Sequence, residues 1–182
     1  MKIGKTLYVT NRKAWRAWLR KNHKNASETW LVYYKKHTGK PRIAYDDAVE
    51  EALCYGWIDS IVMRVDDERT AQRFSPRRPK SFLSETNKER ARRLIKAKKM
   101  TRAGLEKIQT QLEEKFEYAE DIIVALRQDR KTWEHFRRFP ESYRRVRIGW
   151  IEAARHYPKI FQQRLGYFLR MTAQNKKFGM VQ

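Results

Sequence analysis

The sequence contains a single cysteine, Cys54, among 182 residues. One thiol excludes any disulfide within the chain and fits a reducing compartment. Residues 1–15 have no apolar run long enough for a signal peptide. No stretch approaches the roughly 18 apolar residues of a membrane-spanning helix. We therefore expect a cytoplasmic protein with no membrane span.

Acidic residues are scarce relative to basic ones. The 42 lysines and arginines outnumber the 21 aspartates and glutamates, which leaves a net charge of +21. The excess is concentrated in residues 73–103, where twelve basic residues accompany only two acids, Glu85 and Glu89. Such a patch attracts polyanions, and the binding weakens as salt rises. Hydrophobic residues still make up 41% of the chain, so the composition predicts a folded core.

The common catalytic signatures are absent from the sequence. There is no Walker motif, no G-x-G-x-x-G and no G-x-S-x-G. The four histidines are far apart and share no zinc-ligand spacing: His23, His37, His135 and His156. Cys54 ends an apolar helical stripe, where the helix dipole disfavours a thiolate, so we interpret it as a core residue. The sequence predicts no enzyme, no metal site and no cofactor.

The first half of the chain alternates strand-like and helix-like segments. In order, we expect a short strand at 6–9, a helix from a Thr10 or Asn11 cap to 21, a strand at 29–36, a helix capped by Asp46, strands at 57–66 and 69–76, and helices at 84–99 and 101–112. Gly56 follows the second helix, where a left-handed residue is favoured. Thr101 is the predicted cap of the last helix in this series.

The second half is helical in pattern, with apolar residues three and four apart, as in Val146, Trp150 and Ala153. Pro140 and Pro158 lie near predicted helix starts, and short connections favour antiparallel neighbours. The predicted fold class is α+β. We expect an N-terminal antiparallel sheet with helices over residues 1–104, followed by a C-terminal helical bundle over 105–182 that packs on it.

The stretch CYGWIDS, residues 54–60, places a carboxylate inside an apparent strand. Alternation puts one charge on the apolar face formed by Trp57, Asp59, Ile61, Met63 and Val65. A turn at Asp67-Glu68 would pair Val65 with Thr70, Met63 with Gln72, Ile61 with Phe74 and Asp59 with Pro76. That register brings Arg77 and Arg78 beside Asp59. Because an isolated buried charge is costly, a partner is expected.

Three interpretations of Asp59 remain open. It could form a structural ion pair between strand and loop, or the strand assignment could be wrong. In the functional interpretation it belongs to a pocket for a small ligand or a protein partner. The residues of that pocket would be Trp57, Asp59, Gln72, Arg77, Arg78 and Ser81.

The alternative function is nucleic-acid binding through the basic segment 73–103. Four basic residues follow one face of its predicted helix: Lys88, Arg92, Lys96 and Lys99. Arg77, Arg78 and Lys80 would extend that surface toward DNA or RNA. Aromatic residues for base stacking are few there, since only Phe82 is close. A weaker alternative, anionic membrane headgroups, lacks the apolar helix face that insertion needs.

Several motifs resemble one known family. GWIDS, QRFSPRRPKSFLSETN and RLIKAKKMTRAGL, together with FPESYRRVRIGWIEAAR and RLGYFLRMTAQNKK, resemble the YdeI/OmpD-associated (bacteriocin-protection) family. The resemblance extends from about residue 5 to residue 178. Leu83 stands where that family usually has tryptophan, and Lys98-Lys99 stand where it has Gly-Arg.

The resemblance implies an α+β fold of the frataxin-like and YjbR-like kind. It also implies a bacterial stress-tolerance protein, because members are linked to tolerance of bacteriocins and cationic antimicrobial peptides. No catalytic residue carries over. Frataxin-type iron binding would need an acidic helix face, whose nearest match is Asp46, Asp47, Glu50 and Glu51. The basic balance of the chain makes us reject iron.

Overall fold

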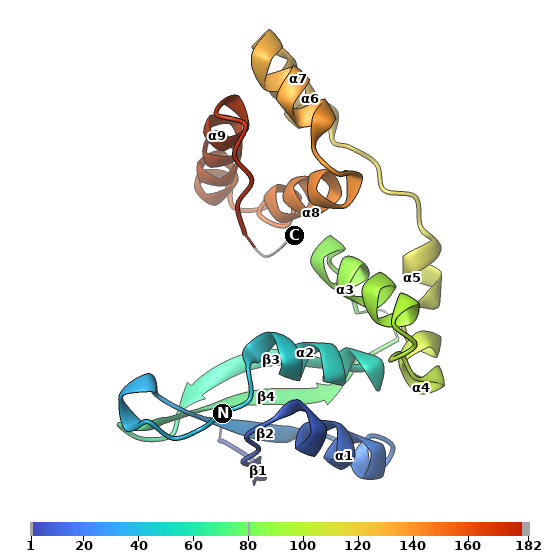
Figure 1. The fold of residues 1–182 in the computed structure, drawn as a ribbon, viewed down its shortest axis with the longest axis vertical. Coiled ribbons are helices and arrows are strands. Elements are labelled where there is room, and N and C mark those ends of the chain that lie inside the picture. Colours follow the sequence, from blue (N-terminus) through green and yellow to red (C-terminus); the bar gives the residue numbers. More distant parts are fainter. Residues whose placement is uncertain (1, 80, 180–182) are drawn as a thin grey trace. The chain divides into compact units, whose positions relative to one another are not determined.

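The computed structural model describes residues 2–79 and 81–179, and the chain forms two compact units (Figure 1). Unit 1 comprises Met1–Phe82 and Arg90–Leu112, and unit 2 comprises Leu83–Glu89 and Glu113–Gln182. The α+β class is confirmed, since unit 1 contains a four-stranded sheet with helices and the C-terminal region is all-helical.

The sheet of unit 1 is mixed. Its strands are β1 (Thr6–Leu7), β2 (Thr29–Tyr34), β3 (Trp57–Arg64) and β4 (Arg69–Pro76), in the order β1-β2-β4-β3. The β2–β4 and β3–β4 pairs are antiparallel, as predicted, whereas β1 and β2 are parallel. The prediction of a wholly antiparallel sheet is therefore wrong for β1. An intervening helix returns the chain to the start of β2, which is how parallel neighbours are connected.

Two helices, α1 (Arg12–Asn22) and α2 (Tyr45–Cys54), lie side by side on one face of this sheet (Figure 1). Asn11 caps α1 by accepting the N–H of Ala14. The buried Trp15 ring packs 5.5 Å from that of Phe74 on β4, and its Nε1 donates to the Ala48 carbonyl of α2 at 3.0 Å. These contacts fix both helices against the sheet.

The first turn of α2 differs from the prediction. Its N-cap is Ala44, which makes no side-chain cap bond, so the predicted Asp46 cap is wrong. Asp46 lies inside the first turn, where the helix dipole favours a carboxylate, and pairs with Arg90 at 2.5 Å. An acidic side chain can stabilise this helix end through the dipole without capping it.

Ion pairs join α1 to α2. Glu51 of α2 is only 2% exposed and accepts hydrogen bonds from Arg12 and Arg16 of α1. Arg12 also pairs with Asp47 at 3.0 Å and with Glu50 at 2.9 Å. A buried carboxylate requires such partners, because an uncompensated buried charge is strongly destabilising.

The C-terminal end of α2 contacts the start of α4 (Arg102–Glu106), which α5 (Gln109–Glu113) follows in the chain. A short 3₁₀ helix, η1 (Lys36–Thr38), follows β2. Thr101 caps α4, as predicted, and donates its hydroxyl and backbone N–H to the Cys54 carbonyl at 2.5 and 3.2 Å. A Cβ on Gly104 would overlap that carbonyl, and Gly56 has a φ of +72°. The two glycines let α2 and α4 approach closely. The predicted helix 101–112 is thus two short helices.

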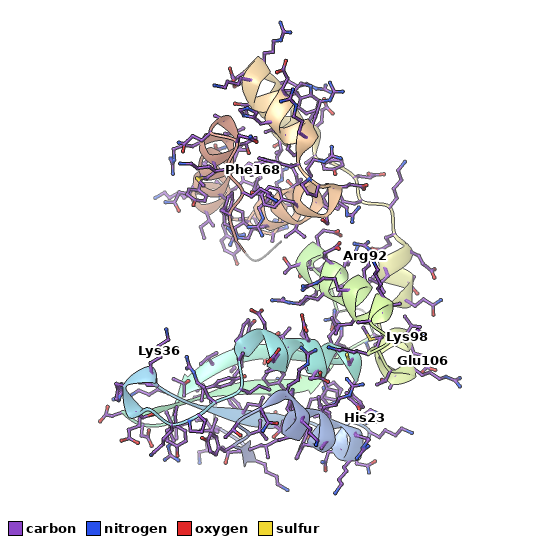
Figure 2. The ribbon with its side chains drawn as sticks, in the orientation of Figure 1. His23, Lys36, Arg92, Lys98, Glu106 and Phe168 are labelled. Atoms are coloured by element: carbon purple, nitrogen blue, oxygen red, sulfur yellow. The ribbon has the colours of Figure 1, made fainter. Side chains whose placement is uncertain are left out.

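Unit 2 is built from α6 (Glu120–Arg127), α7 (Arg130–Arg138), α8 (Glu141–Glu152) and α9 (Pro158–Ala173). Its core is apolar and largely aromatic: Ile122, Leu126, Phe136, Tyr143, Ile148, Ile151, Phe161 and Phe168. Phe168 on α9 lies among these helices in Figure 2. Among the residues described, no helix combines the length and apolar character that crossing a membrane requires.

The helix α3 (Glu85–Lys96) ends through a left-handed residue, Lys98, whose φ is +54° (Figure 2). The N–H groups of Lys98 and Lys99 bond to the carbonyls of Ile95 and Leu94. This is the position at which the resembling family has glycine. A non-glycine residue in this conformation is disfavoured by about 1–2 kcal/mol.

We expect Lys98→Gly to raise the free energy of unfolding by up to about 1 kcal/mol, because relief of the left-handed cost exceeds the entropy glycine adds to the unfolded chain. The midpoint of unfolding in guanidinium chloride measures the effect, provided that the dependence of the free energy of unfolding on denaturant concentration is unchanged. Lys96→Gly, inside α3, is the matched control and should lower the midpoint. A lower midpoint for Lys98→Gly would contradict this account.

Candidate functional site

The β3–β4 hairpin has a different register from the one predicted. The observed pairs are Arg64 with Thr70, Met63 with Ala71, Val62 with Gln72, Asp59 with Phe74, Ile58 with Ser75 and Trp57 with Pro76. Asp66 accepts the N–H groups of Glu68 and Arg69, which stabilises a longer turn than Asp67-Glu68. A bulge between Asp59 and Val62 shifts the register again. The predicted pairing of Asp59 with Pro76 is therefore wrong.

The predicted apolar face of β3 is also wrong. β3 lies at the edge of the sheet, and Ile61 and Val65 are 45% and 37% exposed. The bulge interrupts the alternation on which the prediction rested. Trp57 is the exception: it is 2% exposed, packs 5.7 Å from Trp18, and donates from Nε1 to the His23 carbonyl. Trp57 is thus a core residue that packs against α1 and the residue that follows it.

Asp59 is partly buried and receives two hydrogen bonds from neutral donors. The Tyr45 hydroxyl and the Gln72 Nε2 both donate to its Oδ2 at 2.9 Å. Gln72 was among the predicted site residues, whereas Tyr45 was not. No sequence signal pointed to Tyr45, because its approach depends on where the first residue of α2 lies over the sheet. No donor within residues 2–79 and 81–179 reaches Oδ1 of Asp59.

Arg77 lies deeper than expected. Its side chain is 3% exposed, and its Nη2 donates to the carbonyls of Ser81 and Phe82 at 3.0 and 2.9 Å. Its Nε is buried and finds no partner in the described part of the chain. Burial lowers the pKa of Arg77, and the charge of Asp59 opposes that shift. The two residues are therefore electrostatic neighbours.

The predicted ion pair at Asp59 is not formed within the described residues. No carboxylate–guanidinium contact there joins Asp59 to Arg77 or Arg78. Arg78 is exposed to solvent. Ser81 contributes its backbone carbonyl, which accepts from Arg77 and from Gln111. The shifted register explains the difference, since it moves Asp59 away from the loop that follows β4.

Tyr33 on β2 completes this group. Its hydroxyl is buried without a hydrogen-bond partner in the described structure. Burial, then the neighbouring Tyr45 and Asp59, raises the pKa of Tyr33. Burial and Asp59 likewise raise the pKa of Tyr45 to about 12. We call Asp59 and the four residues around its carboxylate the Asp59 cluster: Tyr33, Tyr45, Asp59, Gln72 and Arg77.

The Asp59 cluster can bind polar groups. At neutral pH both phenols are protonated; Tyr45 already donates to Asp59, whereas the Tyr33 hydroxyl is free to donate. Arg77 carries a donor without a partner, and Asp59 offers a second oxygen as an acceptor. The cluster contains no thiol, hydroxyl–histidine pair or lysine of the kind that forms covalent intermediates. What the cluster offers is a set of hydrogen-bond donors and acceptors.

Five of the twelve cations in the basic segment 73–103 pair with acids from elsewhere in the chain: Arg73–Glu28, Lys88–Glu114, Arg90–Asp46, Arg93–Glu50 and Arg102–Glu106. The segment's own acids, Glu85 and Glu89, in turn pair with Arg145 from outside it. Lys88 is 6% exposed and also pairs with Glu85. Lys96 and Lys99 are exposed, and Arg92 is partly exposed and engaged with other residues. The four residues predicted to bind nucleic acid do not share one exposed face.

The acidic face of α2 is occupied by arginines. Asp46 pairs with Arg90, and the other acids pair with Arg12, Arg16 or Arg93. In the part of the chain that the structure describes, no three His, Cys, Asp or Glu residues are grouped as metal ligands would be. The acids predicted as the nearest match to an iron site are thus bound to cations of the protein itself.

Cys54 is fully buried, and burial together with the charge of Glu51 raises its pKa to about 11. We therefore expect the native thiol not to react with dithionitrobenzoate at mildly alkaline pH, because it is protonated and inaccessible. Concentrated guanidinium chloride should release one equivalent of thionitrobenzoate. Rapid stoichiometric labelling of the native protein would show that Cys54 is a reactive group.

Two family models match the chain. Residues 7–107 match a domain of unknown function, DUF8412, and residues 115–175 match the family described as Bacteriocin-protection, YdeI or OmpD-Associated (OmdA). The family resemblance noted in the sequence is confirmed for the C-terminal helices, whereas GWIDS lies in the DUF8412 match. No curated protein and no solved structure matches the chain. The chain belongs to the DUF8412 family and carries an OmdA domain at residues 115–175.

Proposed function

We propose that the protein is a non-enzymatic binding protein, and that the Asp59 cluster takes a small polar ligand or a polar group of a protein partner. The observation that carries the proposal is that two of the buried side-chain atoms without partners, Tyr33 Oη and Arg77 Nε, belong to residues of this cluster. Each such atom costs about 1–3 kcal/mol when it stays unpaired. Both belong to residues that feel the charge of Asp59. Because Tyr33 pairs with Thr70, which precedes Arg77 by a full length of β4, a small ligand at Asp59 would complete one of these two atoms.

The donors and acceptors define the ligand. Arg77 Nε and the Tyr33 hydroxyl need an acceptor, while Oδ1 of Asp59 can take a donor. A group with a donor beside an acceptor satisfies both requirements, and an amide has this arrangement. We propose that the natural ligand is a peptide or another amide-bearing molecule.

The OmdA match supports a role in tolerance of bacteriocins. Bacteriocins are peptides, and each peptide bond carries an N–H donor next to a carbonyl acceptor. We propose that the protein contributes to stress tolerance by binding such a chain in the cytoplasm. The alternative, nucleic-acid binding through residues 73–103, is less favoured because acids from outside the segment pair with its cations.

We expect N-acetylglycinamide to shift the backbone amide resonances of Tyr33, Tyr45, Asp59 and Gln72 in ¹⁵N-labelled protein. N,N-dimethylacetamide, which has the acceptor but no donor, should bind at least about tenfold more weakly, a difference of 1.4 kcal/mol. Asp59→Asn should weaken binding of the first probe similarly. Glu68→Gln, an exposed acid in the hairpin turn, is the matched control and should leave the affinity unchanged.

Tyr33→Phe separates binding from folding. Removing a buried hydroxyl that has no partner should leave the stability of the free protein unchanged or raise it. The same change should weaken N-acetylglycinamide if the hydroxyl contacts the ligand. The proposed site would be rejected if wild type, Asp59→Asn and Tyr33→Phe bound N-acetylglycinamide equally well. It would also be rejected if neither probe shifted the amide resonances of the cluster.

A further inference from the structure

The C-terminal helical unit has a surface whose charge is not neutralised. Residues 153–182 contain no aspartate or glutamate. Five cations in this stretch make no ion pair within the described residues: Lys159, Arg164, Arg170, Lys176 and Lys177. Arg155 differs, because it pairs with Asp121 and Glu152 at the start of the stretch. Positive charge is therefore available along α9 and the segment after it.

Exposed rings lie on the same helix. Tyr157, at the N-cap of α9, is 63% exposed, and Ile160 and Tyr167 are 44% and 37% exposed. With Arg164, these residues recur three and four apart, which places them along one side of the helix. Phe161, Phe168 and Thr172 are buried along the adjoining side of the helix. The exposed residues therefore form a continuous strip rather than scattered positions.

Two arginines of α9 lie over aromatic rings, and one of these rings is the exposed Tyr167. The Arg170 guanidinium lies 5.3 Å from the Tyr167 ring centroid. Arg164 lies 4.8 Å from the Trp150 ring centroid and donates to the Trp150 carbonyl at 2.5 Å, which fixes its position. Gly166 leaves open space between Lys159 and Arg170, since a Cβ there would meet nothing within 4 Å. We call Tyr157, Lys159, Ile160, Arg164, Tyr167 and Arg170 the α9 strip.

From these contacts we infer that the α9 strip binds single-stranded nucleic acid. Flat rings stack on unpaired bases, and each base–aromatic stack contributes about 1–3 kcal/mol. Arginine and lysine beside the rings neutralise phosphates and release counterions. Tyr157 and Tyr167 are about 15 Å apart along the helix axis, so one short strand can reach both.

Single strands fit this surface better than the other polyanions do. A duplex keeps its bases stacked internally, so it could use the cations but not the rings. An acidic peptide would likewise leave the tyrosines without stacking partners. Insertion into an anionic membrane would need a broad apolar face, whereas Tyr157, Ile160 and Tyr167 are interspersed with charges. This inference is independent of the Asp59 cluster, which lies in unit 1.

The test is fluorescence anisotropy of a labelled mixed-sequence single strand of about 15 nucleotides, within the usual size of such sites, titrated with the full chain at several salt concentrations. We expect the paired variant Tyr157→Ala, Tyr167→Ala to lose at least about fivefold in affinity per ring without a change in salt slope. The variant Lys159→Gln, Arg170→Gln should reduce the slope by about 0.7 per charge.

The matched control is Lys96→Gln, Lys99→Gln, which removes the same charge from exposed positions in the basic segment. It should change affinity less than the α9 charge variant does. Tyr157→Phe, Tyr167→Phe should retain binding, because the rings remain. The inference would be overturned if the two charge variants lost affinity equally, or if removing the rings had no effect. Binding of duplex or of polyglutamate as tightly as the single strand would overturn it as well.

Discussion

The position of α2 depends on one buried carboxylate, Glu51, and the rest of unit 1 depends on α2. Arg12 and Arg16 bind Glu51 from α1, and removing one partner of such a buried pair costs about 3–5 kcal/mol. With α2 fixed, its first residue, Tyr45, reaches Asp59, and its last carbonyl, at Cys54, receives Thr101. The hydrogen bond from Tyr45 to Asp59 therefore depends on an ion-pair network formed elsewhere on the same helix.

The scarcity of acids gives the two units different surfaces. Unit 1 pairs its acids with arginines from α1, β4 and α3. The stretch from residue 153 onward has no acid to do the same. Both units keep an excess of positive charge, and exposed cations beside tyrosines remain on α9. The two sites that we propose, the Asp59 cluster and the α9 strip, lie in separate units.

Local chemistry predicted much of the fold, and distant contacts account for what it missed. The left-handed Gly56, the Thr101 cap and the buried Cys54 follow from residue type and position. The hairpin register does not, because the Asx interactions of Asp66 and the bulge after Asp59 each add a residue that alternation cannot detect. Gln72 lies on the hairpin and was found as a neighbour of Asp59, whereas Tyr45 was missed because its approach depends on where α2 lies over the sheet. Lys88 was misjudged because its partner, Glu114, is far away in the sequence.

The central claim is that Asp59, Tyr33 and Arg77 are arranged to receive a group that the chain itself does not supply. The most direct measurement is a high-resolution crystal structure of the protein soaked with N-acetylglycinamide. The account predicts the probe bound between Oδ1 of Asp59 and at least one of the two donors, Tyr33 Oη and Arg77 Nε. A direct ion pair between Asp59 and Arg77, with the Tyr33 hydroxyl bonded within the chain and no probe present, would contradict it.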